Sequence, residues 1–191
     1  MLTRARRAVV GHDRQMSGSV FVRDARDGDG AAIGRVQVQS WQATYRGVFG
    51  DDHLDALDPE ARGREWTEWL ATGDERPHAR MLVVEVDAIV QGFSSIGPNQ
   101  DGLGSDVGEV WSIYLHPDVI GRGVGRTLFG AVVDVLRARG HVEAVLWVAE
   151  ANVRARRFYE HAGWNADGAT KTDTSFGPPV VEVRYRTRLT P

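Results

Sequence analysis

The sequence contains no cysteine, a single lysine and no long uninterrupted run of apolar residues. The absence of cysteine excludes disulfides, thiolate metal ligands and cysteine nucleophiles, and it fits a reducing compartment, so we expect a cytoplasmic protein. No stretch approaches the roughly 20 consecutive apolar residues that a membrane span needs, so no membrane association is expected. The formal net charge of −3 gives no positive field that would attract nucleic acid, which is therefore not an expected partner.

The first residues are rich in arginine but lack the apolar core of a secretory signal, which takes roughly 7 to 15 residues. We expect residues 1–18 to form a disordered N-terminal arm, or translation to begin at Met16. An arginine arm that contacts nucleic acid is the weaker alternative. The chain has 191 residues, of which 42% are apolar, and this is enough for one core, so residues 19–190 are expected to form a single domain.

Periodicity and turn residues predict an alternation of strands and helices. Residues 79–88 and 89–97 are β-branched runs that should pair as a hairpin around Asp87 and Ala88. The other expected strands are residues 19–25, 109–117, 141–150, 169–177 and 180–189, and helices are expected within residues 27–48, 51–73, 124–139 and 152–163. This order predicts one mixed α/β sheet with helices on both faces.

A glycine-rich loop, with the sequence HPDVIGRGVGRTL, occupies residues 116–128 between an expected strand and an expected helix. Amide groups of a first helical turn have no partner within the helix, and glycine lets a phosphate approach the backbone, so this pattern predicts an anion site. A tight turn without a ligand is an equally good interpretation of the glycines alone. The dinucleotide pattern G-x-G-x-x-G and the P-loop lysine are both absent, so neither motif identifies a nucleotide.

A second motif, EANVRARRFYEHAGW, follows about thirty residues downstream of the glycine loop. Together the two motifs resemble the acyl-CoA core of the GNAT superfamily of N-acetyltransferases, in which a Q/R-x-x-G-x-G/A loop precedes an N-x-x-A-x-x-F/L-Y-x-x-x-G-F segment. The residues in register with the second segment are Asn152, Ala155, Phe158, Tyr159 and Gly163. The resemblance extends from residue 20 to the end of the chain and implies a single GNAT-like domain with a twisted, mostly antiparallel central sheet.

The resemblance implies an acetyl-CoA-dependent N-acetyltransferase that transfers an acetyl group directly to a primary amine of a small molecule, peptide or protein. The sequence does not identify the acceptor, because no acid cluster or aromatic cage stands out in it. Two positions depart from the family pattern: Ile120 replaces the usual Gln or Arg, and Trp147 stands where some members carry a catalytic Glu. These departures support the alternative, a non-catalytic acyl-CoA-binding or partner-binding module on the same fold.

The resemblance also implies which residues bind the cosubstrate, acetyl-CoA. The glycine loop would hold the diphosphate, the strand before it would pair with the pantetheine amides, and an asparagine at the next helix start would reach the cofactor. The positions concerned are Ile113, Tyr114, Leu115, Gly121, Arg122, Gly123, Val124, Gly125, Arg126 and Asn152.

Transfer to an amine needs a proton acceptor for the ammonium form and benefits from a proton donor for the leaving thiolate. Tyr159 is the expected donor, and packing against the core is the alternative role for its ring. Glu109 is the expected base. A role as a solvated carboxylate at the end of a strand is an equally good interpretation of this residue. Glu150 and a water chain are further candidates for the base.

Trp41 and Tyr45 are expected to bind the amine substrate, although residues of this size four positions apart are also typical of a core. The six histidines show no metal-binding spacing, so no metal is expected. The last strand could pair across a homodimer.

Overall fold

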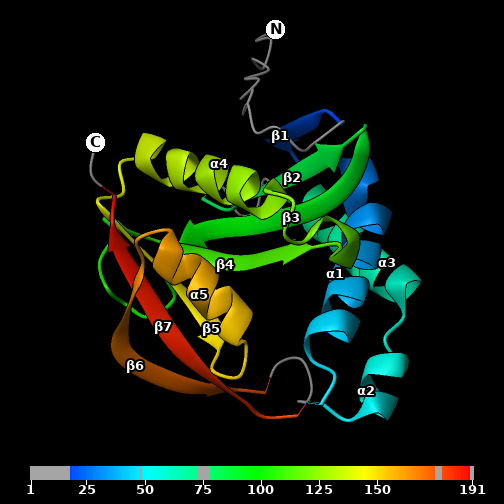
Figure 1. Cartoon of the computed structure of the whole chain (residues 1–191). Helices are drawn as coiled ribbons and strands as arrows, with labels where there is room; N and C mark the ends of the chain where they lie inside the picture. Colours follow the sequence, from blue (N-terminus) through cyan, green and yellow to red (C-terminus); the bar gives the residue numbers. More distant parts are fainter. Residues whose placement is uncertain (1–17, 48, 73–77, 175–177, 190–191) are drawn as a thin grey trace, which may run out of the picture.

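The computed structural model describes residues 18–47, 49–72, 78–174 and 178–189, and its ribbon is drawn in Figure 1. The expected N-terminal arm lies outside the described residues except for Gly18. The strands are β1 (Val20–Asp24), β2 (Arg80–Val86), β3 (Ile89–Pro98), β4 (Val107–Leu115), β5 (Glu143–Ala149), β6 (Asn165–Asp173) and β7 (Val180–Arg188). The helices are α1 (Gly30–Thr44), α2 (Asp51–Asp55), α3 (Pro59–Ala71), α4 (Val124–Ala138) and α5 (Val153–His161), with short 3-10 turns η1 (Asp27–Asp29) and η3 (Pro117–Val119).

The strands form one seven-stranded sheet in the order β1-β2-β3-β4-β5-β7-β6. Every neighbouring pair is antiparallel except β4 and β5, which run parallel. The predicted mixed, mostly antiparallel sheet is therefore confirmed. The predicted hairpin of β2 and β3 is confirmed as well, and its turn residues Asp87 and Ala88 both have positive φ, at 51° and 65°.

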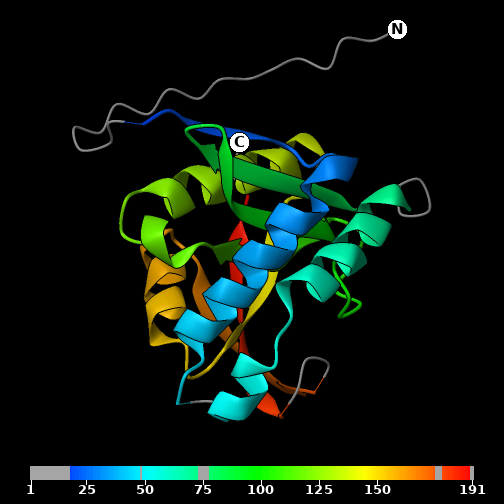
Figure 2. The ribbon, with the colours of Figure 1, turned by 90° about the vertical axis from the view of Figure 1, so that its right-hand side faces the viewer.

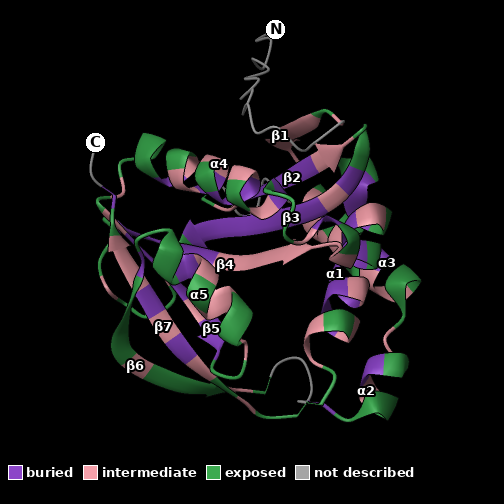
Figure 3. Cartoon of the chain, in the orientation of Figure 1, coloured by how far each residue is buried: buried purple, intermediate pink, exposed green. Residues whose placement is uncertain are grey.

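The last strand does not have a free edge, and that part of the dimer argument is wrong. β7 pairs with β5 on one side and with β6 on the other, so the edge strands are β1 and β6. The final hairpin turns back into the sheet because residues 180–189 carry buried side chains, Val183 and Tyr185, that pack into the core. β6, in contrast, is largely exposed (Figure 3). A homodimer stays a prediction.

β4 and β5 are bonded only over the first part of their length. Their pairing runs from Val107 opposite Glu143 to Val110 opposite Leu146, while β4 continues to Leu115 beside β3, and β5 continues to Ala149 beside β7. The register of β3 and β4 shifts at Trp111, which has no partner in β3 and forms a bulge. Because a bulge bends a strand, β4 turns away from β5 beyond this point and leaves an opening within the sheet (Figure 1).

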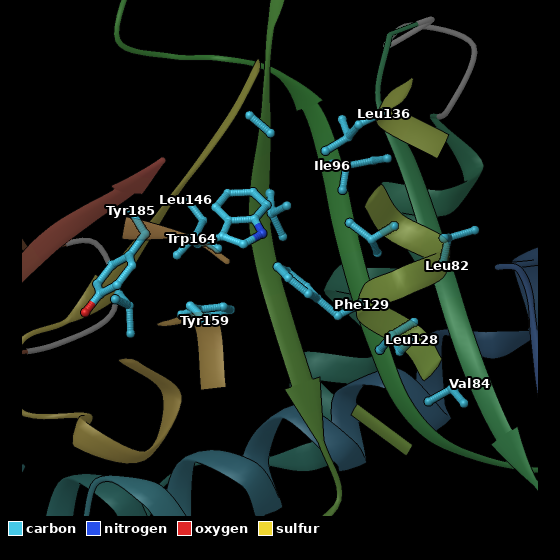
Figure 4. Packing of buried hydrophobic residues seen from close by; sticks show 14 of the residues in the cluster. Leu82, Val84, Ile96, Leu128, Phe129, Leu136, Leu146, Tyr159, Trp164 and Tyr185 are labelled. Atoms are coloured by element: carbon cyan, nitrogen blue, oxygen red, sulfur yellow. The ribbon is translucent and has the colours of Figure 1, made fainter. Parts of the chain in front are cut away.

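Helices cover both faces of the sheet, as predicted. α1 and α3 lie side by side on one face (Figure 2), where Ile33 and Val36 of α1 pack against Val83 and Phe93. α4 lies on the other face, and its apolar side packs against alternate residues of β2, such as Leu82. This second cluster continues to α5, where Phe129, Tyr159, Trp164 and Tyr185 lie together (Figure 4).

The contact between α1 and α3 depends on three glycines, Gly30, Gly34 and Gly63. A Cβ atom at Gly34 would lie 2.4 Å from the backbone nitrogen of Gly63, and one at Gly30 would lie 2.8 Å from the backbone nitrogen of Thr67. The two helices can approach this closely only because no side chain stands between them. Gly130 in α4 is different, because a Cβ there would meet nothing within 4 Å.

Alanine substitutions at these helical glycines should therefore have opposite effects on stability. Gly34→Ala forces α1 and α3 apart, so the free energy of unfolding should fall by about 1–3 kcal/mol. Gly130→Ala only removes backbone freedom from the unfolded chain, so the free energy of unfolding should rise by about 0.5–1 kcal/mol. Urea unfolding of both variants checks this, and equal effects at the two positions would contradict it.

Candidate active site

A cavity of about 730 Å³ lies at the opening between β4 and β5. Its walls come from α1, β4, the glycine loop, β5, α5 and the final hairpin. The residues predicted from sequence that line it are Trp41, Tyr45, Glu109, Ile113, Tyr114, Leu115, Gly121, Gly123, Gly125, Arg126, Asn152 and Tyr159. Segments far apart in the chain are thus brought to one site.

The glycine loop forms the wall of the cavity at the start of α4. Gly121 and Gly123 have positive φ values of 79° and 82°, a conformation that favours glycine, and Gly123 is the N-cap of α4. No side chain caps this helix end, so its first amides are left for another acceptor. A Cβ at Gly121 or Gly123 would meet nothing within 4 Å, whereas one at Gly125 would lie 2.7 Å from the Leu115 side chain.

Two predicted loop residues do not line the cavity with their side chains. Val124 is 1% exposed and belongs to the core under α4. Arg122 is exposed, and its Nη1 donates to the backbone oxygen of Asp118 at 3.5 Å. Arg126, one turn further, is exposed and does line the cavity. The Arg122 amide donates to the Val119 carbonyl at 3.3 Å, so of these two residues only Val124 is placed to offer a backbone amide to an anion.

Along the opening, the edge of β4 that faces β5 has no strand partner from Trp111 to Leu115. Tyr114 in this segment packs between Trp41 and Phe93, with ring centroids 6.4 and 5.3 Å away. Desolvation raises the pKa of the Tyr114 hydroxyl far above its ordinary value. The segment therefore combines a fixed side chain with backbone groups that an extended ligand can bond.

Tyr159 lies on α5 and faces the cavity from the aromatic cluster, which surrounds its ring. The side chain is 5% exposed, and its ring centroid lies 5.5 Å from Phe129 and 6.0 Å from Tyr185. Burial raises the pKa of its hydroxyl far above the ordinary value, and the charges of nearby tyrosinates would raise it further. The hydroxyl therefore stays protonated at neutral pH and can act as a proton donor.

Asn152 fixes the start of α5 beside the first helix. Its Oδ1 accepts a hydrogen bond from the Ala155 amide at 3.1 Å, as an N-cap does. It also bonds Tyr45, whose pKa is raised by burial and lowered in part by this contact. Tyr45 in turn lies 5.5 Å from Trp41 between ring centroids, and both pack with Phe49. Trp41 and Tyr45 therefore belong to a core cluster and to the cavity wall at once.

Glu109 is the third residue of β4 and is only 4% exposed, so it is not a solvated strand-end carboxylate. Its Oε2 accepts the Gln100 amide at 2.8 Å. Burial raises the pKa of the Glu109 carboxyl, and the Gln100 hydrogen bond offsets part of this effect. A carboxyl with a raised pKa is suited to accept a proton. Glu150, the other candidate, is exposed and is not part of the cavity wall.

Charged and aromatic residues that the sequence motifs do not indicate reach the cavity from the last two strands and from β5. Glu182 of β7 forms an ion pair with Lys171 of β6 at 3.5 Å, and Lys171 lies 4.4 Å above the Trp147 ring. Burial raises the pKa of Glu182. The alternation of residues 180–189 places Glu182 opposite to the core side chains, but no local signal shows what it faces.

Within the described part of the chain, no group of three or more His, Asp or Glu side chains is arranged to hold a metal ion. None of the described helices has the length and apolar character required to cross a membrane.

Comparisons with known proteins agree with this architecture. The sequence model of the acetyltransferase (GNAT) family matches residues 19–164. An uncharacterized N-acetyltransferase of Archaeoglobus fulgidus is 30% identical over 127 residues, which are 65% of this chain and 79% of that protein. The mycothiol acetyltransferase of Thermobispora bispora is 35% identical over 138 residues, which are 68% of this chain but only 44% of that larger protein.

Among solved structures, the yncA acetyltransferase of Salmonella typhimurium, determined with its cofactor acetyl-CoA, has the same fold. Its TM-score is 0.64 at 22% identity, and the match covers 90% of this chain and 94% of that one. The fold, the two predicted motifs and the family match therefore lead to one conclusion: the chain belongs to the GNAT family of acetyltransferases.

Proposed function

We propose that the protein is an acetyl-CoA-dependent N-acetyltransferase that acetylates a primary amine by direct attack. The observation that carries the proposal is the opening between β4 and β5, which joins the glycine loop to Glu109 and Tyr159 in one cavity. The loop suits a diphosphate because its glycines keep side chains away and the first amides of α4 have no side-chain cap. Acetyl-CoA, when bound, supplies the activated acetyl group.

Different segments of the chain bind the different parts of acetyl-CoA and the acceptor. The amides of Gly121 and of Gly123 to Arg126 hold the diphosphate, and the free edge from Ile113 to Leu115 bonds the pantetheine amides as a neighbouring strand would. Asn152, which already caps α5, approaches the cofactor with its remaining polar atoms. Trp41 and Tyr45 form the wall against which the acceptor binds.

One side chain accepts a proton in the reaction and another donates one. Glu109 takes a proton from the acceptor ammonium, so that the nitrogen lone pair can form the new C–N bond as the C–S bond breaks. Tyr159 then gives its proton to the leaving thiolate. The burial of Glu109 supports catalysis over a non-catalytic binding role, because it raises the pKa of the carboxyl toward the range in which a base works at neutral pH, while the Tyr159 hydroxyl keeps a proton to donate.

Cofactor binding is tested at Gly123, where the backbone conformation is strained for any other residue. Gly123→Glu should abolish acetyl-CoA binding in isothermal titration, because it adds a negative charge at the phosphate position. Gly123→Ala is the matched control, since it carries the same backbone strain without the charge, and it should bind more tightly than the glutamate variant. Absence of binding by the unmodified protein at millimolar acetyl-CoA would contradict the proposal.

Tyr159→Phe should reduce kcat by roughly 10² to 10⁴ with little change in the affinity for acetyl-CoA. Phenylalanine keeps the ring contacts with Phe129 and Tyr185, so the loss reports the hydroxyl alone. Thiol release and titration calorimetry measure the two quantities, and an unaltered rate would rule out the donor role.

Glu109→Gln should lower activity and raise stability. The rate loss should be greatest between the pKa of Glu109 and that of the acceptor ammonium, where the carboxylate is ionised and the acceptor still carries the proton that it must lose. The raised pKa means that the buried carboxylate opposes folding above that pKa, and that this effect disappears as the pH falls below the ordinary value. The variant should therefore have a higher Tm than the parent at pH 8 and an equal one at pH 4. A rate loss that does not depend on pH would indicate that water, and not Glu109, is the base.

A further inference from the structure

Three carboxylates from three strands face the cavity away from the glycine loop: Glu109 of β4, Asp173 of β6 and Glu182 of β7. Successive residues of a strand point to opposite faces of the sheet. Val110 and Val183, the neighbours of two of these residues, point into the core beneath α4 and α5. Glu109 and Glu182 therefore share the other face of the sheet.

Trp147 stands between these two glutamates. Glu109 is opposite Val145 and Glu182 is opposite Ala149 on the two sides of β5, so the indole comes from the residue midway between those positions. The Trp147 Nε1 donates to Asp101 at 3.1 Å, which fixes the ring. The result is an aromatic surface with a carboxylate at each end, a combination that suits cationic groups, and Lys171 Nζ and the Arg184 guanidinium already lie 4.4 and 5.5 Å from the ring centroid.

The two glutamates have few partners of their own. Glu109 is 4% exposed, and the Gln100 amide bonds one oxygen, while the other has no donor among the described residues and is not sealed from the cavity. Lys171 is the cation that acts on Glu182. The other cavity-lining cations of the described chain, Arg126 and Arg154, belong to the first turns of α4 and α5.

The two glutamates cannot serve one ammonium group throughout the reaction. Once Glu109 has taken the proton of the attacking nitrogen, it is neutral and no longer holds the acceptor by charge. Glu182 keeps its charge at the far side of Trp147 and can hold a second cation while the first nitrogen reacts. We propose, building on the proposed function, that the acceptor is a linear amine with a second cationic group, which Glu182 binds.

The spacing of the strands sets the length of this acceptor. β4 and β7 are separated by β5, which amounts to two strand spacings, or roughly 10 Å, and the two glutamates are offset by four residues along β5, or roughly 13 Å, so their Cα atoms lie roughly 16 Å apart. Glutamate side chains that reach toward each other shorten this gap by several ångströms, so an extended α,ω-diaminoalkane of about seven or more carbons is needed to span it between its nitrogens. Shorter diamines would reach only one of the two glutamates and would bind like monoamines.

The experiment compares α,ω-diaminoalkanes of three to ten carbons with n-alkylamines of equal carbon number. Thiol release from acetyl-CoA is the readout, and the chain itself gives no background because it has no cysteine. The longer diamines should exceed their matched monoamines in kcat/KM by about tenfold or more. Turnover of monoamines with no preference for diamines at any length would overturn this inference and leave the proposed function standing. Absence of thiol release with every amine would count against the proposed function instead.

Variants then locate the second cation. Glu182→Gln should reduce the ratio of diamine to monoamine kcat/KM by about tenfold, mainly through KM. Lys171→Gln should increase that ratio, because it removes the competing cation. Glu68→Gln, an exposed position on α3, is the matched control and should leave ratio and rate unchanged. The assignment would be overturned if Glu182→Gln reduced kcat/KM equally for diamines and monoamines, or if Lys171→Gln reduced the ratio of diamine to monoamine kcat/KM.

Discussion

The separation of β4 from β5 is the constraint on which the site depends. Each strand stays bonded to its other neighbour, so the sheet remains whole on both sides while its middle opens. The bulge at Trp111 starts this separation. Unpaired backbone groups inside a protein are costly unless another partner bonds them. An open edge that lines a cavity is thus a feature that a strand-like ligand would stabilise.

The aromatic cluster below the opening holds Tyr159, the residue that we propose as the proton donor, within the core. The rings of Phe129 and Tyr185 hold Tyr159 from two sides, and Trp164 completes the cluster (Figure 4). The same burial that stabilises the fold raises the pKa of the Tyr159 hydroxyl and keeps its proton in place. Rigid packing and the proposed proton donation therefore depend on one arrangement, and removing the ring would disturb both.

The sequence predicts local features well and distant ones poorly. The glycine loop and the segment from Asn152 to Gly163 are contiguous, so their residues could be assigned before the structure was available. Glu182 could not be, because its place beside the cavity results from β7 pairing with β5, far away in the chain. The loop motif also led to Val124 as a cofactor-binding residue, although its side chain lies in the core. A motif gives the position of a backbone group but not the direction of its side chain.

The two ends of the cavity carry opposite charge. Its cationic end is formed by a helix start and Arg126, and its anionic end by Glu109 and Glu182 on the opposite face of the sheet. Burial raises the pKa of Glu109, and the charges of Asp101 and Glu182 add to this effect, so the ionised carboxylate opposes folding. A bound cation would offset that cost. The acidic end is therefore better explained by the cationic acceptor that we propose than by the stability of the fold.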